Sequence, residues 1–139
     1  MIITSYNIRG VGGGRKLASL KRIFEQIKPD IILIQETMAD VHRARVSFLK
    51  LFLGWEVCAT DVVSLSGGLL CIWNPTRADL DAYYTHAGIL LKGRVKDDGE
   101  QVQIINCYAP IEIRKLSGTW LISLGLLEGK MSYWAKTLI

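Results

Sequence analysis

The stretch Pro29-Asp30-Ile31-Ile32-Leu33-Ile34-Gln35-Glu36-Thr37 decides the fold that we expect of this chain. Its apolar run is unbroken from Ile31 to Ile34, which is typical of a β-strand covered on both faces. The strand then ends in Gln35, Glu36 and Thr37. A carboxylate at the end of an apolar strand is costly unless water or a cation compensates its charge, so Glu36 is the first candidate for a functional residue.

A strand and a helix precede this stretch. Residues 1–8 are β-rich and lead into a glycine-rich turn over residues 10–14. Apolar residues then recur at helical spacing, as Leu17, Leu20, Ile23, Phe24 and Ile27. The unit is therefore strand, helix, strand. If the two strands are neighbours, the amide of Asn7 and the carboxylate of Glu36 point to the same edge of a sheet.

Shorter elements follow Thr37. We predict a helix over residues 42–53, an extended segment over residues 55–60, a strand over residues 69–73, and a hairpin of residues 89–95 and 102–107. The pair Gly67 and Gly68 forms a turn or bulge, or else allows a nucleic-acid backbone to approach closely. The pattern weakens from residue 111, because three glycines interrupt the helix that Arg114, Lys115 and Trp120 would suit.

The amino-acid composition restricts the class of protein only broadly. With 139 residues, half of them hydrophobic, the chain is at most one packed domain. The net charge of +4 is spread over small basic groups, which we interpret mainly as solvated surface. The three cysteines are far apart and form no zinc or disulfide pattern. No secretory signal or membrane-spanning run is visible, so we expect an intracellular protein, with the nucleus as one option.

Three segments together resemble a known superfamily. They are Thr4-Ser5-Tyr6-Asn7-Ile8-Arg9-Gly10, the stretch quoted first, and Ile104-Ile105-Asn106-Cys107-Tyr108-Ala109-Pro110. In this order they resemble the endonuclease/exonuclease/phosphatase superfamily, which includes DNase I-like nucleases, abasic-site endonucleases and the endonuclease domains of non-LTR retrotransposons. The residues of the Gln-Glu-Thr and Tyr-Ala-Pro motifs look most similar to those of the abasic-site endonucleases and the retrotransposon endonuclease domains. The resemblance implies an α/β fold, a partial four-layer α/β/β/α sandwich without its C-terminal half. We assign residues 1–115 to it and residues 116–139 to a divergent tail.

The resemblance also implies roles for four residues. Glu36 would bind Mg²⁺ or Mn²⁺, and Asn7 would orient the phosphate and support the ligand shell. Tyr108 would contact the scissile phosphate, and Arg9 would help to bind the substrate, with DNA as the expected partner. Each has a structural alternative: Glu36 as a carboxylate in a surface loop, Asn7 as a turn former, and Tyr108 as a packed aromatic ring. Asp30 is expected to be structural, near the metal edge.

The later motifs of the superfamily are missing from this sequence. Neither Gly-Asp-Phe-Asn nor Ser-Asp-His occurs, Glu112 and Glu128 are the only carboxylates after residue 110, and neither His42 nor His86 follows an Asp. We therefore expect little or no turnover. The alternatives are a non-catalytic module that binds nucleic acid or protein, and a fragment of a phosphatase of the same superfamily. We also expect the chain to supply about one sheet, whose bare inner face would promote self-association.

Overall fold

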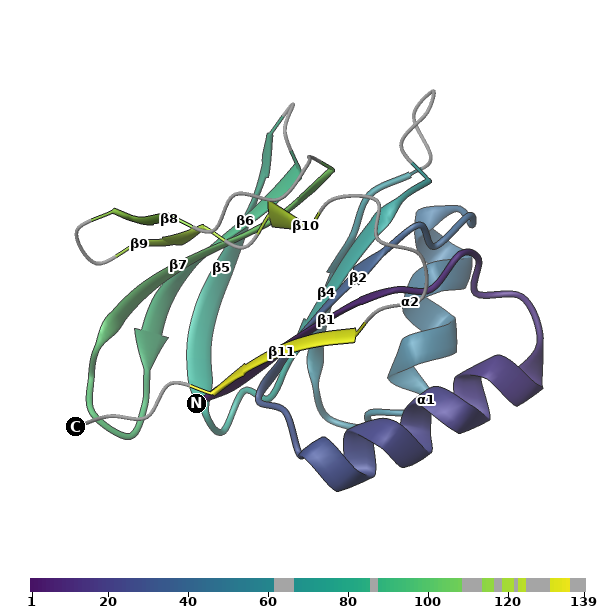
Figure 1. The fold of residues 1–139 in the computed structure, drawn as a ribbon, viewed down its shortest axis with the longest axis horizontal. Helices are drawn as coiled ribbons and strands as arrows, with labels where there is room; N and C mark the ends of the chain where they lie inside the picture. Colours follow the sequence, from purple (N-terminus) through teal and green to yellow (C-terminus); the bar gives the residue numbers. More distant parts are fainter. Residues whose placement is uncertain are drawn as a thin grey trace.

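The fold places two β-sheets face to face, with both helices on the outer side of the first sheet (Figure 1). It is seen in a computed structural model that describes residues 1–61, 67–85, 88–108, 114–116, 119–121, 123–124 and 131–135. These residues therefore form three layers: helices, first sheet and second sheet.

The first sheet has the strand order β11-β1-β2-β4-β3. Its strands are β1 (Ile2–Asn7), β2 (Ile31–Gln35), β3 (Glu56–Ala59), β4 (Leu69–Trp73) and β11 (Met131–Ala135). β1 and β2 are parallel, and the other pairs are antiparallel. The expected strand, helix, strand unit is confirmed, because α1 (Gly14–Ile27) connects the two parallel strands.

Helix boundaries follow from local capping. α1 ends at Ile27 because Lys28 takes a left-handed conformation (φ 54°), from which its backbone N–H donates to the carbonyl of Phe24. α2 (Val41–Leu49) begins after Asp40, whose side chain accepts a hydrogen bond from the backbone N–H of Arg43. The helix is shorter than the predicted residues 42–53: Lys50 keeps helical angles (φ −66°), but the backbone N–H of Leu51 donates to the carbonyl of Phe48 (2.9 Å) in a tighter turn that ends the helix.

The second sheet has the order β5-β6-β7-β9-β8, and β10 also pairs with β7. Its strands are β5 (Ala78–Thr85), β6 (Gly88–Val95), β7 (Gln101–Tyr108), β8 (Arg114–Leu116), β9 (Thr119–Leu121) and β10 (Ser123–Leu124). The predicted hairpin is confirmed as β6 and β7, which pair antiparallel. β5 was not predicted, although its alternation of Asp79 and Asp81 with Leu80 is typical of a half-buried strand.

Two corrections concern the second sheet. The chain does not supply one sheet with a bare inner face: Leu80, Ile89 and Leu91 of the second sheet pack with Ile31 and Leu33 in one core between the sheets. The segment suited to a helix around Arg114 and Trp120 is instead part of β8 and β9, which pair antiparallel beside β7. Strand pairing with β7 outweighs the local helical preference there.

The second core lies between the first sheet and the helices. Leu20 and Phe24 of α1 and Phe48 of α2 pack on Ile32 and Ile34 of β2. All five residues of β2 are buried, which confirms that this strand is covered on both faces.

No helix among the described residues is long and apolar enough to cross a membrane. β11 pairs with β1, and the domain boundary after residue 115 stays a prediction.

Candidate metal and phosphate site

The ends of β1 and β2 bring two predicted site residues to one edge. Asn7 lies directly opposite Gln35 in the parallel register, and Glu36 follows Gln35. The two chains stay paired beyond the strands, because the backbone N–H of Ile8 donates to the carbonyl of Gln35 (3.0 Å) and that of Gly10 to the carbonyl of Glu36 (2.6 Å). The two strands are thus neighbours, as their assignment to a common edge required.

Glu36 has an unusual backbone conformation. Its φ is 53°, in the left-handed region that residues other than glycine rarely adopt. Flanking hydrogen bonds fix it, since the N–H of Thr37 donates to Gly68 (3.2 Å) and that of Met38 to Gly67 (2.6 Å). The side chain is half-buried, and within the described residues no hydrogen bond or ion pair occupies its carboxylate. Strain of this kind gathers at functional sites, which motivates a functional hypothesis for Glu36.

The two adjacent glycines pack against this loop. A Cβ at Gly67 would lie 2.6 Å from the Sδ of Met38 and 3.0 Å from the Cα of Glu36. Gly68 has a φ of 86°, and a Cβ there would collide with the hydroxyl of Thr37. The glycine pair thus allows the segment before β4 to lie close to the loop that carries Glu36. Ser66, which precedes the pair, lies outside the described residues.

Asn7 and Arg9 form the turn after β1. The Oδ1 of Asn7 accepts a hydrogen bond from the backbone N–H of Arg9 (3.2 Å), so the turn-forming interpretation of Asn7 is correct. An amide oxygen has a second lone pair, so this turn and a role toward a ligand are compatible. Arg9 is exposed, with a φ of 48°.

Lys16 stabilises the same turn through hydrogen bonds, a role that the sequence analysis did not predict. Its ammonium donates to three consecutive carbonyls, those of Ile8 (3.0 Å), Arg9 (3.1 Å) and Gly10 (3.1 Å). Lys16 is thus an exception among the basic residues, most of which we interpreted as solvated surface. A basic residue soon after a glycine-rich turn was the available signal, since loop carbonyls without strand partners need donors.

A buried polar network joins the two sheets behind this edge. The Nε2 of Gln35 donates to the Oδ1 of Asn106 on β7 (2.7 Å) and to the hydroxyl of Ser5 on β1 (3.0 Å). The Nδ2 of Asn106 donates to the carbonyls of Ile34 (3.1 Å) and Leu70 (3.0 Å). Asn106 is fully buried, so the network fixes β7 against β2 next to Glu36.

Buried thiols lie beside this network. Cys71 on β4 accepts a weak hydrogen bond from Asn106 (3.5 Å) and lies directly opposite Cys58 of β3. Burial raises the pKa of Cys71, and its hydrogen bond with Cys58 adds to the shift. The same hydrogen bond lowers the pKa of Cys58.

The last of the predicted site residues is at the end of β7. Tyr108 is the last residue of β7, two positions after Asn106, with its backbone opposite Leu124 of β10. Ala109, Pro110, His86, Glu112 and Glu128 lie outside the described residues.

Asp30 is structural, as expected, but its expected location is wrong. It precedes β2, whereas Glu36 follows that strand, so the two carboxylates lie at opposite ends of it. Asp30 accepts hydrogen bonds from the backbone N–H of Ile2 (2.8 Å) and from the Nε of Arg77 (3.1 Å). This contact with Asp30, together with the charge of Asp97, raises the pKa of Arg77.

Few of the described side chains at this edge could coordinate a metal ion. Within the described part of the chain, no group of three or more His, Cys, Asp and Glu side chains lies close enough to hold an ion. Mg²⁺, however, is commonly held in phosphate-handling sites by one or two carboxylates together with waters and substrate phosphates. Glu36 is one carboxylate of this kind, and Asn7 ends the neighbouring strand at the same edge.

Comparisons with known proteins show similarity in structure only. No family model matches the sequence, and no curated protein matches it. Solved structures do match. An AP endonuclease from Leishmania major superposes with a TM-score of 0.59 at 15% identity, over 78% of this chain and 40% of that one. A protein described as an endonuclease/exonuclease/phosphatase from Bacteroides vulgatus gives 0.60 at 11% identity, over 77% of this chain and 51% of that one.

A mannosyl-6-phosphatase from Bacteroides thetaiotaomicron gives a TM-score of 0.58 at 15% identity, over 78% of this chain and 51% of that one. The chain has the fold of the endonuclease/exonuclease/phosphatase superfamily, which confirms the resemblance at the level of the fold. It spans between 40% and 51% of the lengths of these three structures, which agrees with a partial sandwich.

Proposed function

We propose that this chain carries the metal and phosphate side of a phosphodiester-hydrolysing site and has little turnover of its own. The observation that supports this most is the parallel pairing of Asn7 with Gln35: Asn7 ends β1, and Glu36 directly follows β2 at the same edge. Glu36 would hold Mg²⁺ or Mn²⁺, and a bound cation of this type supplies charge stabilisation to a phosphoryl oxygen. Asn7 would orient the phosphate, and Arg9 and Tyr108 would bind it.

Low turnover is proposed from the missing activating groups. The sequence contains neither Gly-Asp-Phe-Asn nor Ser-Asp-His, the superfamily motifs that would act on the attacking water. General acid–base assistance is worth about 10² to 10⁴ in rate, and a cation alone does not replace it. The residues of this chain therefore bind and orient a phosphate better than they activate a nucleophile.

DNA is the substrate class that we favour. The sequence around Glu36 and Tyr108 looks most similar to the abasic-endonuclease and retrotransposon branch of the superfamily. One matching structure is an AP endonuclease. A phosphatase fragment is the alternative, because a mannosyl-6-phosphatase superposes equally well. A non-catalytic nucleic-acid module would show salt-dependent binding without metal-dependent cleavage.

Two measurements test the proposal. Mn²⁺ binding, followed by electron paramagnetic resonance, should be lost in Glu36→Gln and kept in Glu56→Gln, which removes an exposed carboxylate of β3. Equal binding by both variants would overturn the metal role. Nicking of supercoiled plasmid with Mg²⁺ should be weak in the unmodified chain. Robust nicking that Glu36→Gln abolishes would overturn the low-turnover part alone.

Self-association and location are further proposals. Since the inner sheet face is covered, self-association would use the outer face of the second sheet, where Tyr83, Leu90 and Ile105 lie opposite one another on three adjacent strands. Tyr83 is half exposed, and the other two are partly buried. An intracellular, optionally nuclear, location stays a prediction that microscopy of a tagged chain would test.

A further inference from the structure

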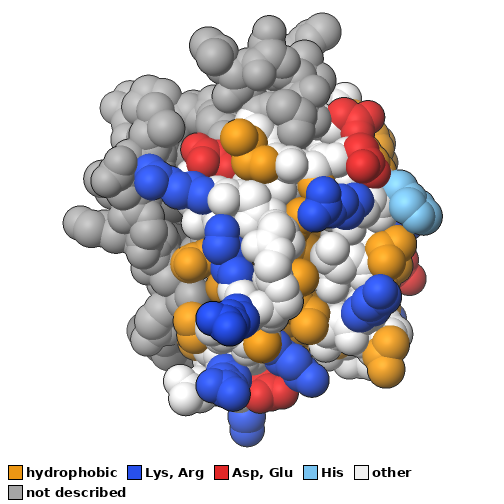
Figure 2. Space-filling model, turned by 90° about the vertical axis from the view of Figure 1, so that its right-hand side faces the viewer, with side chains coloured by type: hydrophobic (Ala, Val, Ile, Leu, Met, Phe, Trp, Pro, Cys, Tyr) orange, Lys and Arg blue, Asp and Glu red, His pale blue; other side chains and the backbone are white. Residues whose placement is uncertain are grey.

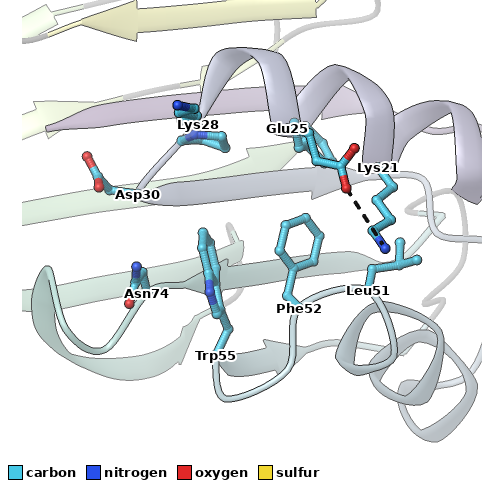
Figure 3. A pocket seen from close by; sticks show the side chains of 10 residues that line it. Lys21, Glu25, Lys28, Asp30, Leu51, Phe52, Trp55 and Asn74 are labelled. Carbon is cyan, nitrogen blue, oxygen red and sulfur yellow. Dashed lines mark ion pairs between the residues drawn. The ribbon is translucent and has the colours of Figure 1, made fainter.

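A groove lies at the opposite end of the first sheet from Glu36. It has a volume of about 380 Å³ and runs between the C-terminal half of α1 and the connection from α2 to β3, with Asp30 and Asn74 at one end (Figure 3). Asp30, at one end of the groove, precedes β2 and Glu36 follows it, so at about 3.3 Å per residue the backbones of these two residues are about 20 Å apart. The groove is therefore separate from that site.

Aromatic rings form one wall of this groove. Phe52 and Trp55 rise from the α2–β3 connection toward α1 (Figure 3), with ring centroids 4.9 Å apart and an interplanar angle of 43°. Phe24 of α1 also lines the groove, and its ring centroid is 5.8 Å from that of Phe52. Trp55 is only partly buried, although a ring of its size is usually well covered in a core. The wall offers a rigid aromatic surface to a ligand.

Cations lie along the same groove. Lys21 and Lys28 line it, and Lys21 is 3.9 Å from Glu25 in an exposed ion pair, which constrains it little. The surrounding helices are basic: α1 carries Arg15, Lys16, Lys21 and Arg22 against the single Glu25, and α2 carries Arg43 and Arg45 with no acidic residue. Figure 2 shows Lys and Arg side chains distributed over this face of the molecule. The groove itself is lined by two cations, Lys21 and Lys28, and by two carboxylates, Glu25 and Asp30, so the excess of positive charge comes from the helices around it.

Aromatic rings beside cations have a defined ligand chemistry. In proteins that bind single strands, a basic groove follows the phosphates while the bases stack on aromatic rings. A duplex keeps its base faces stacked internally and offers phosphates and base edges, but no base face on which a ring can stack. An acidic peptide would use the lysines and leave the face of Trp55 without a role. The combination of Trp55 with Lys21 and Lys28 thus favours a single-stranded nucleic acid.

We propose that this groove binds single-stranded nucleic acid, with a base stacked on Trp55 and the neighbouring phosphates held by Lys21, Lys28 and the basic surface of α1. The site is separate from the proposed phosphodiester-hydrolysing edge and needs no metal. Binding to it is therefore measured in EDTA, where the role of Glu36 does not contribute. A failure of one proposal leaves the other unaffected.

Fluorescence anisotropy of a labelled oligo-dT of about 12 nucleotides, within the usual range of about 4 to 16 for single-strand sites, tests this proposal. A duplex of equal length is the comparison ligand. Loss of one stacked base costs about 1 to 3 kcal/mol, so Trp55→Leu should weaken single-strand binding about 5- to 150-fold. Trp55→Phe should retain most of the affinity. Lys28→Gln should weaken binding less and reduce its dependence on salt.

A matched pair of controls lies on the second sheet. Lys92 is 5.6 Å from the centroid of the Tyr83 ring there, so Tyr83→Leu and Lys92→Gln remove the same residue types from another face. Both should change the affinity less than about twofold. If Trp55→Leu binds like the unmodified chain, or if Tyr83→Leu loses as much, the proposal is overturned. If Trp55→Leu does not fold, unchanged binding by Lys21→Gln/Lys28→Gln overturns it instead.

Discussion

The side-chain amide of Gln35 donates to that of Asn106 over 2.7 Å, and this contact joins two residues that are 71 positions apart in the chain. It crosses from one sheet to the other, immediately behind the edge that carries Glu36. Asn106 also donates across the sheets to the carbonyls of Ile34 and Leu70, whereas the surrounding core between the sheets is apolar and does not fix one lateral position. The amide pair therefore sets the position of β7 relative to β2.

Replacing Asn106 by Leu should destabilise the protein. The amide of Gln35 would lose its acceptor and the carbonyls of Ile34 and Leu70 would each lose one donor, and a buried polar group left unpaired costs about 1 to 3 kcal/mol. Urea denaturation should show a lower free energy of unfolding. Gln103→Leu, at an exposed position of the same strand, is the control and should change it by less than about 0.5 kcal/mol. Equal stability of the two variants would contradict the role of Asn106.

Gly67→Ala should disturb the conformation of Glu36. The added Cβ would lie 3.0 Å from the Cα of Glu36 and 2.6 Å from the Sδ of Met38, so the loop must shift. We expect a lower melting temperature and weaker Mn²⁺ binding. Gly12→Ala is the matched control, since a Cβ there meets nothing within 4 Å. A Gly67→Ala variant with normal Mn²⁺ affinity would show that the metal does not depend on this loop.

Lys16→Met should loosen the turn after β1. The substitution keeps the length of the side chain and removes the donor to the carbonyls of Ile8, Arg9 and Gly10. Hydrogen exchange of the backbone amides in residues 8–11 should become faster, with a stability loss of about 1 kcal/mol. Arg22→Met, at an exposed position of the same helix, should leave this exchange unchanged. Unchanged exchange in Lys16→Met would argue that strand pairing alone holds the turn.

Alkaline pH should reduce the stability through Cys71. Burial raises the pKa of this thiol above its ordinary value of 9.0, so the folded state keeps a proton that the unfolded chain releases. Its contribution is complete below pH 9 and declines as the pH rises toward the folded pKa. Cys71→Ala should make the fall in melting temperature above pH 9 less steep than Cys107→Ala, which removes another buried thiol. Parallel pH profiles of the two variants would contradict this.

Self-association, if it uses the outer face of the second sheet, should depend on Leu90. Light scattering of the unmodified chain should show a mass that rises with concentration, and Leu90→Lys should lower it by placing a charge between Tyr83 and Ile105. Leu53→Lys, at an exposed position outside this face, should not. A monomer at every concentration would exclude the proposal.

The sequence by itself determined the local elements. The apolar run from Ile31 to Ile34 predicted a strand covered on both faces, and helical spacing after the glycine-rich turn predicted α1. The signal is strong because period and burial are properties of consecutive residues. The three motifs also predicted the superfamily fold, which the structural comparisons confirm.

Only the tertiary structure decided which distant residues meet. It placed Asp30 at the end of β2 away from Glu36, directed Lys16 onto three loop carbonyls and joined Gln35 to Asn106. It also covered the inner sheet face with strands of the same chain, including the unpredicted β5. The physical reason is that periodicity tells which face of an element is buried, whereas the partner of that face is selected by packing between segments far apart in the sequence.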